Sequence, residues 1–483
     1  MKRQAVAFIL IFVLAAAVFT GSTAYVWGHR NDLTFTGEVL SGDRGDAGGA
    51  AIKQRSSLLG SLVWNTEYDA GSGESSTESR WYLDYPASYS YDAEPYFYFY
   101  APSLNFGSSW TGGNTDSRPD GLEDEGEYLA EIFDYAMSRI DGYGSWSGRV
   151  RLNDFTDYLP LTMDSDMVVD KNSGERAHDM ESIFRIPLNR EVWLDVSCSL
   201  DEYGGSFDIR EDTLYYDVNS NSVYAADGNL YVLLDIREYV DDVAARSDCS
   251  LLPGGDFGIY RIPCEPSEAP YEISNWPMQL TADFDAVENI YPLGSGWDSA
   301  YLQKSSDGEN LLLFTAESGS LRLTVIDPET GGVLQQEELL GARQAASFGQ
   351  DIIYDHLAYS NFYQLDGGFV LDFYPLLIEV RYENGLYRAA QVIDRSTWPV
   401  PEGLTSAGAE VHTGSGGLQF VANGARLYIL ERGYYPPLTE GEDYLGYDVP
   451  FLRLLIYEGG QSVYAEWITN PLLGMRDSLE LIA

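Results

Sequence analysis

The chain has 483 residues and is strongly acidic, because 75 aspartates and glutamates outweigh 29 lysines and arginines to give a formal net charge of −46. Binding to phosphate-rich partners needs clustered lysine and arginine, so this composition excludes nucleic-acid binding and disfavours contact with anionic lipid. A hydrophobic fraction of 45% provides ample material for a core, which excludes global disorder.

The N-terminus carries the one long apolar run of the sequence. Two cations at positions 2 and 3 precede an uncharged segment from Ala5 to Trp27. About 20 apolar residues are enough to cross a bilayer core, and flanking cations stay on the cytoplasmic side. We therefore expect residues 1–27 to be a transmembrane anchor that places the rest of the chain outside the cell. The small residues at 22–24 would also form a signal-peptidase site, so secretion after cleavage is the alternative.

Residues 28–56 are polar and rich in glycine, and we expect a flexible tether with one short strand candidate from Leu33 to Val39. This segment contains Arg44-Gly45-Asp46, an integrin-type tripeptide that a Gly/Asp-rich linker produces by chance. A single extracellular domain is then expected to span residues 57–483.

One amphipathic helix is expected near residues 126–140, in the N-terminal part of that domain (residues 57–180). The segment EGEYLAEIFDYAMSRI places apolar side chains at helical spacing. We expect this stripe to pack against the core rather than against a partner.

From Val150 onward, short strand-like runs alternate with turn dipeptides. Asn, Asp and Gly tolerate positive φ, so these dipeptides favour tight hairpins. The pairs are Asp227-Gly228, Asp307-Gly308, Asp366-Gly367, Asn384-Gly385 and Asn423-Gly424. Further hairpins are indicated by the turn at 327–331 and by LLIYEGGQSVYAEWI near the C-terminus.

These units recur at uneven intervals, and IFRIP at 183–187 returns as IYRIP at 259–263. Four-stranded blades with variable loops give such a pattern. The sequence thus predicts an all-β fold, a β-propeller of about six to eight blades, with the one helix added. Two β-sandwich domains divided near residues 142–180 are the structural alternative.

Two segments resemble β-propeller blades over about residues 180–470: VIDPETGGVL is similar to a blade hairpin, and DGNLYVLLD to the entry of an inner strand. VRLNDFTDYLPL, IFRIP and IYRIP also resemble segments of single-anchor exported proteins of unknown function from Gram-positive bacteria. The resemblance implies a fold and a location. It implies no activity, cofactor or site residue.

Side chains that carry common catalytic chemistry are scarce. The four histidines, His29, His178, His356 and His412, are far apart in sequence, and we expect each to be a surface or packed residue. GSWSG at 144–148 lacks the central serine of a nucleophile elbow, and the sequence contains no phosphate-loop or dinucleotide motif. No catalytic or ligand-binding residue is therefore named, and no metal or cofactor is expected.

Two short motifs imitate known sites. Residues 217–221 match the first ligands of a calcium loop, but Ser222 and Gly228 stand where that loop needs glycine and glutamate, so a polar hairpin is expected. SSDGEN at 305–310 resembles the Asp-box turn of sialidase-like propellers without its spacing, so an ordinary turn is expected.

The three cysteines, Cys198, Cys249 and Cys264, match no zinc spacing. Either Cys249 and Cys264 form a bridge beside a buried Cys198, or all three are buried thiols.

The strongest chemical bias is the combination of 36 tyrosines and 10 tryptophans with 75 acids. Aromatic rings and paired carboxylates suit sugars, while an acidic surface suits cations or basic partners. We expect a membrane-anchored extracellular β-propeller that acts as a binding module for a protein or a glycan. The alternatives are a glycan-active hydrolase or lyase on the same fold, and a structural component of the envelope.

Overall fold

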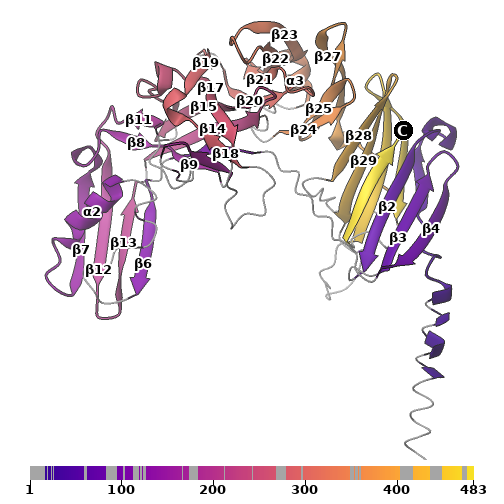
Figure 1. Ribbon diagram of the computed structural model, residues 1–483, viewed down its shortest axis with the longest axis horizontal. Helices are drawn as coiled ribbons and strands as arrows, with labels where there is room; N and C mark the ends of the chain where they lie inside the picture. The colour runs from indigo at the N-terminus through magenta and orange to yellow at the C-terminus, as the bar shows by residue number, and fades with distance from the viewer. Residues whose placement is uncertain are drawn as a thin grey trace, which may run out of the picture. The chain divides into compact units, whose positions relative to one another are not determined.

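The structure is a computed structural model of the whole chain, shown in Figure 1. It describes residues 17–18, 20–22, 24–25, 27–58, 62–82, 95–101, 104–111, 119, 122, 127–165, 167–172, 174, 183–211, 213–241, 243–267, 279–294, 297–348, 353, 357, 360–402, 417–435, 449–469 and 476–483. The chain forms two compact units. The first unit combines Met1–Tyr89 with Asn361–Ala483, and the second is the continuous segment Ser90–Ser360. The division therefore does not fall near residues 142–180.

The first unit contains three antiparallel sheets, in the orders β1-β31-β30-β29-β28, β32-β2-β3-β4 and β24-β25-β26-β27. Their strands are β1 (Thr36–Ser41), β2 (Ala51–Leu58), β3 (Leu62–Asp69), β4 (Glu74–Trp81), β24 (Asn361–Leu365), β25 (Gly368–Phe373), β26 (Leu376–Glu383), β27 (Leu386–Asp394), β28 (Leu418–Asn423), β29 (Arg426–Tyr435), β30 (Val449–Glu458), β31 (Gln461–Thr469) and β32 (Arg476–Ile482), with 3-10 helices η1 (Arg44–Ala47) and η6 (Arg395–Thr397).

The five-stranded sheet is the middle layer of this unit, because both of its faces are buried. Alternate residues of a strand point to opposite faces. Tyr428 and Leu430 pack in one apolar cluster with residues of β2, β3 and β32, whereas Leu427 and Ile429 pack in another with residues of β24–β27. The central strands of this sheet therefore have nearly continuous apolar sequences, instead of apolar and polar residues in alternation.

The prediction of a flexible tether over residues 28–56 is wrong, because residues 30–35 are hydrogen-bonded to β3 and β4 and regular strands begin at Thr36. β1 pairs with β31, and β2 lies between β3 and β32, so N-terminal and C-terminal strands share two sheets. This segment is polar because β2 presents Lys53 and Arg55 to solvent while Ile52 reaches the core. The folded part thus begins before residue 57, and the strand candidate at 33–39 overlaps β1.

The second unit contains a seven-stranded sheet built on β10-β18-β17-β15-β14, two four-stranded sheets, β6-β13-β12-β7 and β20-β21-β22-β23, and the pairs β11-β8 and β5-β9. Its elements are β5 (Tyr98–Tyr100), β6 (Phe106–Thr111), α2 (Glu127–Met137), β7 (Gly144–Arg151), η2 (Leu152–Asp154), β8 (Tyr158–Pro160), β9 (Thr162–Asp164), β10 (Val168–Asp170), β11 (Arg185–Pro187), β12 (Trp193–Leu200), β13 (Gly204–Arg210), β14 (Leu214–Tyr224), β15 (Asn229–Val240), β16 (Val243–Arg246), η4 (Pro253–Gly255), β17 (Gly258–Pro266), β18 (Leu280–Ala282), η5 (Phe284–Ala286), β19 (Glu288–Pro292), β20 (Ser299–Lys304), β21 (Leu311–Glu317), β22 (Ser320–Ile326), β23 (Val333–Leu340) and α3 (Ala342–Phe348).

The all-β prediction is confirmed, and antiparallel sheets of four strands, the repeating element of a propeller blade, recur in both units. Each of the five Asx-Gly dipeptides joins consecutive strands, and every one of their glycines has a positive φ, between +60° and +83°. Positive φ carries no steric penalty for glycine, so these dipeptides fix where the hairpins turn.

The predicted amphipathic helix is α2. Its apolar stripe, Tyr128, Leu129, Ile132, Phe133 and Ala136, is buried. Phe133 meets Phe207 edge to face with ring centroids 5.2 Å apart, so α2 packs on the β6-β13-β12-β7 sheet (Figure 1). The stripe faces the core, as expected, and the short helix α3 is an addition to the predicted elements.

The predicted anchor, residues 1–27, lies mostly outside the described residues. The described residues between 17 and 28 are helical. In the part of the chain that the structure describes, no helix is both long and apolar enough to cross a membrane.

Candidate functional site

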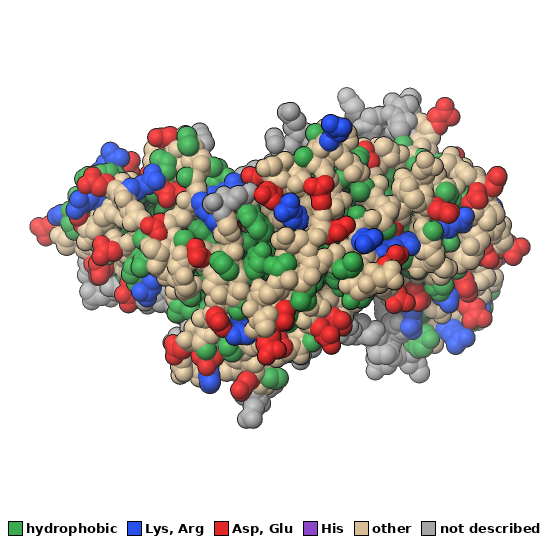
Figure 2. All heavy atoms as spheres, turned by 90° about the horizontal axis from the view of Figure 1, so that it is seen from above, with side chains coloured by type: hydrophobic (Ala, Val, Ile, Leu, Met, Phe, Trp, Pro, Cys, Tyr) green, Lys and Arg blue, Asp and Glu red, His purple; other side chains and the backbone are tan. Residues whose placement is uncertain are grey.

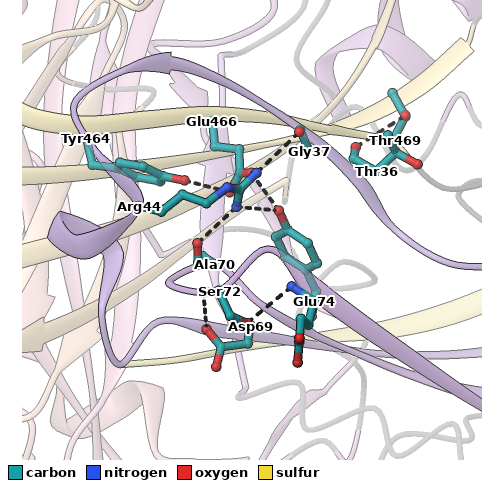
Figure 3. Close-up of polar contacts among 11 residues, drawn as sticks. Thr36, Gly37, Arg44, Asp69, Ala70, Ser72, Glu74, Tyr464, Glu466 and Thr469 are labelled. Carbon is teal, nitrogen blue, oxygen red and sulfur yellow. Dashed lines mark hydrogen bonds and ion pairs between the residues drawn. The ribbon is translucent and has the colours of Figure 1, made fainter.

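The middle sheet of the first unit carries a fully buried carboxylate, Glu466, on the face toward β2 and β3 (Figure 3). Tyr68 and Tyr464 donate their hydroxyls to it at 2.5 and 2.9 Å, and Arg44 forms an ion pair with it at 2.8 Å. Arg44 also donates to the carbonyl of Ala70 at 3.1 Å. Charge and hydrogen bonds therefore compensate the desolvation of this carboxylate.

This network is structural rather than catalytic. Burial and the bond to Glu466 raise the pKa of Tyr68 to about 12, so its hydroxyl stays protonated at neutral pH and is a poor nucleophile. Gly37 fills the remaining space, since a Cβ there would lie 2.1 Å from Glu466 Oε1. A side chain at position 37 would therefore clash with the network.

The opposite face of the same sheet holds a second buried charge cluster. Arg453 of β30 donates to Glu431 of β29 at 2.7 Å, and Arg395 of η6 donates to Asp372 of β25 at 2.9 Å. Both guanidinium groups lie over the Trp398 ring, at 4.9 and 5.1 Å. Burial raises the pKa of Asp372 and lowers that of Arg453. The cluster ties two sheets together and lies in their interface.

The integrin-type tripeptide is not a flexible, exposed motif. Arg44 through Ala47 form η1, and the Arg44 guanidinium is committed to the Glu466 network. Asp46 accepts a hydrogen bond from the backbone of Asp43 at 3.1 Å. Neither charge is presented as a free recognition group.

The calcium-like segment 217–221 lies inside strand β14, not in a loop. The Asn221 amide donates to the carbonyl of Leu302 at 2.6 Å and accepts from its N–H at 3.0 Å. Ser220 and Ser222 accept the backbone N–H groups of the β5 region, at 2.8 and 2.7 Å. Its polar side chains therefore join neighbouring strands, and the hairpin with β15 is as expected.

The remaining motifs lie in a regular strand and a regular turn. GSWSG is the first part of strand β7, and residues 305–310 form the turn before β21, in which Asp307 accepts the N–H of Glu309 at 3.0 Å. His29 stacks on Tyr25, while His178, His356 and His412 lie outside the described residues.

All three cysteines are free thiols, so the predicted alternative of a bridge between Cys249 and Cys264 is wrong. Burial raises the pKa of Cys198 to about 11 and that of Cys264 to about 12, so neither is a reactive thiolate near neutral pH.

The candidate site is a cleft of about 370 Å³ between the first turns of α2 and the segment 153–160. Its wall carries four carboxylates and three aromatic rings. These are Glu127, Glu131, Asp154 and Asp157, with Tyr128, Phe155 and Tyr158. Glu127 and Glu131 are four residues apart in α2 and therefore share one face of the helix.

Hydrogen bonds to the segment 188–192 hold the second wall of this cleft. Asn153 donates to the carbonyl of Arg190 at 2.8 Å and accepts the N–H of Val192 at 3.0 Å. The carbonyl of Asp157 accepts the N–H of Leu188 at 2.9 Å. The acidic side chains thus project from a wall that is already organised.

Two arginines border the cleft and reduce its charge without cancelling it. Arg151 donates to Asp154 at 2.8 Å, and Arg185 stacks over the Tyr158 ring at 4.3 Å. The helix N-terminus adds only about half a positive charge. Glu127, Glu131 and Asp157 are exposed, so the cleft keeps a net negative potential beside the partly exposed rings of Phe155 and Tyr158. This combination suits a cationic group.

A larger groove, about 480 Å³, lies on the outer face of the β32-β2-β3-β4 sheet. Lys53 of β2 pairs with Glu67 of β3 on one side and with Glu480 of β32 on the other, so positive and negative charges alternate across the groove. Among the described residues that line it, none is aromatic. Acidic side chains are also spread over the visible face in Figure 2, so acidity alone does not mark a site. The cleft at α2 differs because it adds aromatic walls.

No residue of this cleft stands out in the sequence, because nothing local distinguishes its four carboxylates from the other aspartates and glutamates among the chain's 75. The available signal was the pairing of an acidic first turn in the one strong helix with the acidic, aromatic segment DFTDY at 154–158. Among the described residues, no group of three or more His, Cys, Asp or Glu is arranged to hold a metal ion.

Comparison with models of known families and with curated proteins finds no match. Among solved structures, the chain aligns with the periplasmic gluconolactonase of Pseudomonas aeruginosa at 11% identity, over 90% of this chain and 99% of that one, with a TM-score of 0.23. A candidate 6-phosphogluconolactonase from Bacteroides uniformis aligns at 12% identity, over 87% and 99%, with a TM-score of 0.20. TM-scores this low support no conclusion about this chain.

Proposed function

We propose that the chain is an exported, membrane-anchored binding module of β-propeller type, and that the cleft at α2 holds a cationic group of its ligand. The anchor is the apolar run that ends at Trp27. The ligand is a surface or secreted polymer that carries amines, such as a protein segment rich in lysine. The observation that carries the proposal is the coincidence of carboxylates and aromatic rings in one preformed cleft.

Charge and geometry support a basic ligand over a neutral one. A cation that enters the cleft meets three exposed carboxylates beside the partly exposed rings of Phe155 and Tyr158. The net charge of −46 raises the local concentration of basic partners before contact. Binding is therefore expected to weaken as ionic strength rises.

The test is equilibrium binding of hexalysine to the full chain in nanodiscs. Hexalysine with acetylated Nε groups, whose side chains carry no charge, is the control. We expect hexalysine to bind and the acetylated peptide not to bind. The triple variant E127Q/E131Q/D157N is expected to bind about tenfold more weakly, because three exposed ion pairs at about 0.5 kcal/mol each amount to about 1.5 kcal/mol.

A matched control separates the cleft from the general acidity. Glu309, Glu329 and Glu338 are exposed glutamates of the same unit, away from the cleft, and E309Q/E329Q/E338Q removes the same number of charges. This control is expected to bind like the parent. Equal losses in both triple variants would mean that binding is diffuse and would overturn the assignment of the cleft.

A catalytic role makes a different prediction from the same cleft. A glycan-active enzyme would use two of its carboxylates, one as acid and one as base or nucleophile. Turnover of any member of a glycoside panel by the purified chain, lost in E127Q/E131Q/D157N, would replace the binding proposal by an enzymatic one.

A further inference from the structure

Two tryptophans that are far apart in sequence lie stacked where the N-terminal helix meets the first unit. The ring centroids of Trp27 and Trp81 are 6.3 Å apart, with an interplanar angle of 15°. Trp27 is 48% exposed and Trp81 is 57% exposed. The Arg30 guanidinium lies 4.1 Å from the centre of the Trp27 ring. A stacked indole pair this exposed leaves apolar surface in water that a partner could cover.

The chain just after Trp27 is fastened to the sheet that carries Trp81. Leu33 packs against Leu62 and Trp64 of β3. Four hydrogen bonds join residues 30–35 to β3 and β4: Trp64 Nε1 to the Arg30 carbonyl (2.8 Å), Ser79 Oγ to Asn31 Oδ1 (2.6 Å), the Thr77 hydroxyl to the Leu33 carbonyl, and the Phe35 N–H to Ser75 Oγ (3.0 Å). Trp81 therefore keeps a fixed position relative to the end of the apolar run.

We propose that Trp27 and Trp81 form one lipid-interface contact, which seats the end of β4 among the headgroups of a zwitterionic phospholipid bilayer. This inference rests on the membrane anchor of the proposed function. Because the apolar run ends at Trp27, that ring lies at headgroup depth, and the stacked ring of Trp81 is carried to the same depth. Tryptophan is enriched at this level of membranes because its ring is apolar and its N–H is polar.

The local charges fit a zwitterionic lipid. Arg30 stands beside the indole pair and provides a cation for a lipid phosphate. A bilayer with a strongly anionic surface would repel a chain of net charge −46, so the contact is not expected to need anionic lipid. This contact then holds the first unit against the membrane in one orientation, instead of leaving it on a flexible linker.

The test uses the full chain in nanodiscs of phosphatidylcholine whose acyl chains are brominated near the headgroup, since bromine quenches tryptophan at short range. W81F is compared with the parent and with W193F, which removes a 41%-exposed tryptophan of the second unit. We expect W81F to lose part of the quenched emission and W193F to lose none of it.

Two failures are distinguishable. If the chain enters nanodiscs and W81F loses none of the quenched emission, the interface contact is wrong while the anchor stands. If the chain does not enter nanodiscs at all, the anchor fails and this inference fails with it. Far-UV circular dichroism of both variants confirms that any change is not due to unfolding.

Discussion

At the scale of single residues, the first unit depends on side chains that satisfy one another in the absence of water. Glu466 has no exposed surface and is held by two tyrosines and one arginine. Burying a carboxylate without partners would destabilise the fold by several kcal/mol. The burial of Glu466 therefore depends on the two tyrosines and the arginine that contact it. The same logic makes a residue with no side chain, Gly37, part of the network.

Gly37→Ala is expected to destabilise the chain by about 1–3 kcal/mol, the usual cost of overpacking, because its Cβ would lie 2.1 Å from Glu466 Oε1. Gly45→Ala is the matched control in the same segment, since a Cβ there meets nothing within 4 Å. Urea unfolding of both variants measures the difference. Equal midpoints for the two would contradict the described packing around Glu466.

At the scale of elements, side chains of strand β14 form hydrogen bonds to neighbouring strands that are not paired with it through the backbone. Asn219 and Asn221 of β14 bond to the backbone of β20, and the serines between and after them bond to the β5 region. A short polar run, DVNSNS, therefore joins three strands of the second unit.

Asn221→Ala is expected to cost about 1–3 kcal/mol, because the N–H and the carbonyl of Leu302 both lose their partner. Asn219→Ala removes one described bond, to the carbonyl of Ala300, and should cost less. Gln336→Ala, at an exposed position of β23, provides a control with little effect. Thermal unfolding gives the order, and a cost for Asn219→Ala above that for Asn221→Ala would contradict this account.

Elements that a few neighbouring residues encode could be predicted from the sequence. Strands that depend on pairing between distant segments could not. Asx-Gly turns and the stripe of α2 are encoded within a few residues, so the hairpins and the helix could be predicted. The pairing of β2 with β32 could not, because the partners are separated by most of the chain and β2 is mostly polar. The cleft escaped prediction for a related reason, since only packing brings α2 beside the segment 153–160.

At the scale of the whole molecule, the two units differ in chain continuity. The second unit is the single segment Ser90–Ser360, whereas the first needs both ends of the chain. We expect residues 90–360 to fold alone with one cooperative thermal transition and a β-type circular dichroism spectrum. A soluble but unfolded product would contradict its independence.

Buried tyrosines should make the first unit sensitive to alkali. Burial is the first cause that raises the pKa values of Tyr68, Tyr363 and Tyr457 to about 12. Above pH 10 the unfolded chain loses these protons before the folded chain does, so their contribution to stability is complete below about pH 10 and is lost as pH rises toward 12.

Urea midpoints between pH 9 and pH 11.5 are therefore expected to fall with rising pH. Tyr363→Phe keeps the contact with the Phe420 ring and removes one ionisable group, so its midpoints should fall less steeply. A slope equal to that of the parent would contradict the raised pKa of the partly buried Tyr363.

The most direct measurement of the central claim is hydrogen exchange of the full chain in nanodiscs, with and without hexalysine. We expect slower exchange at the backbone amides of residues 127–131 and 153–158, the two walls of the cleft, and no change in the groove on the β32-β2-β3-β4 sheet. Protection in that groove, or protection spread evenly over the acidic surface, would contradict a binding module whose ligand enters at α2.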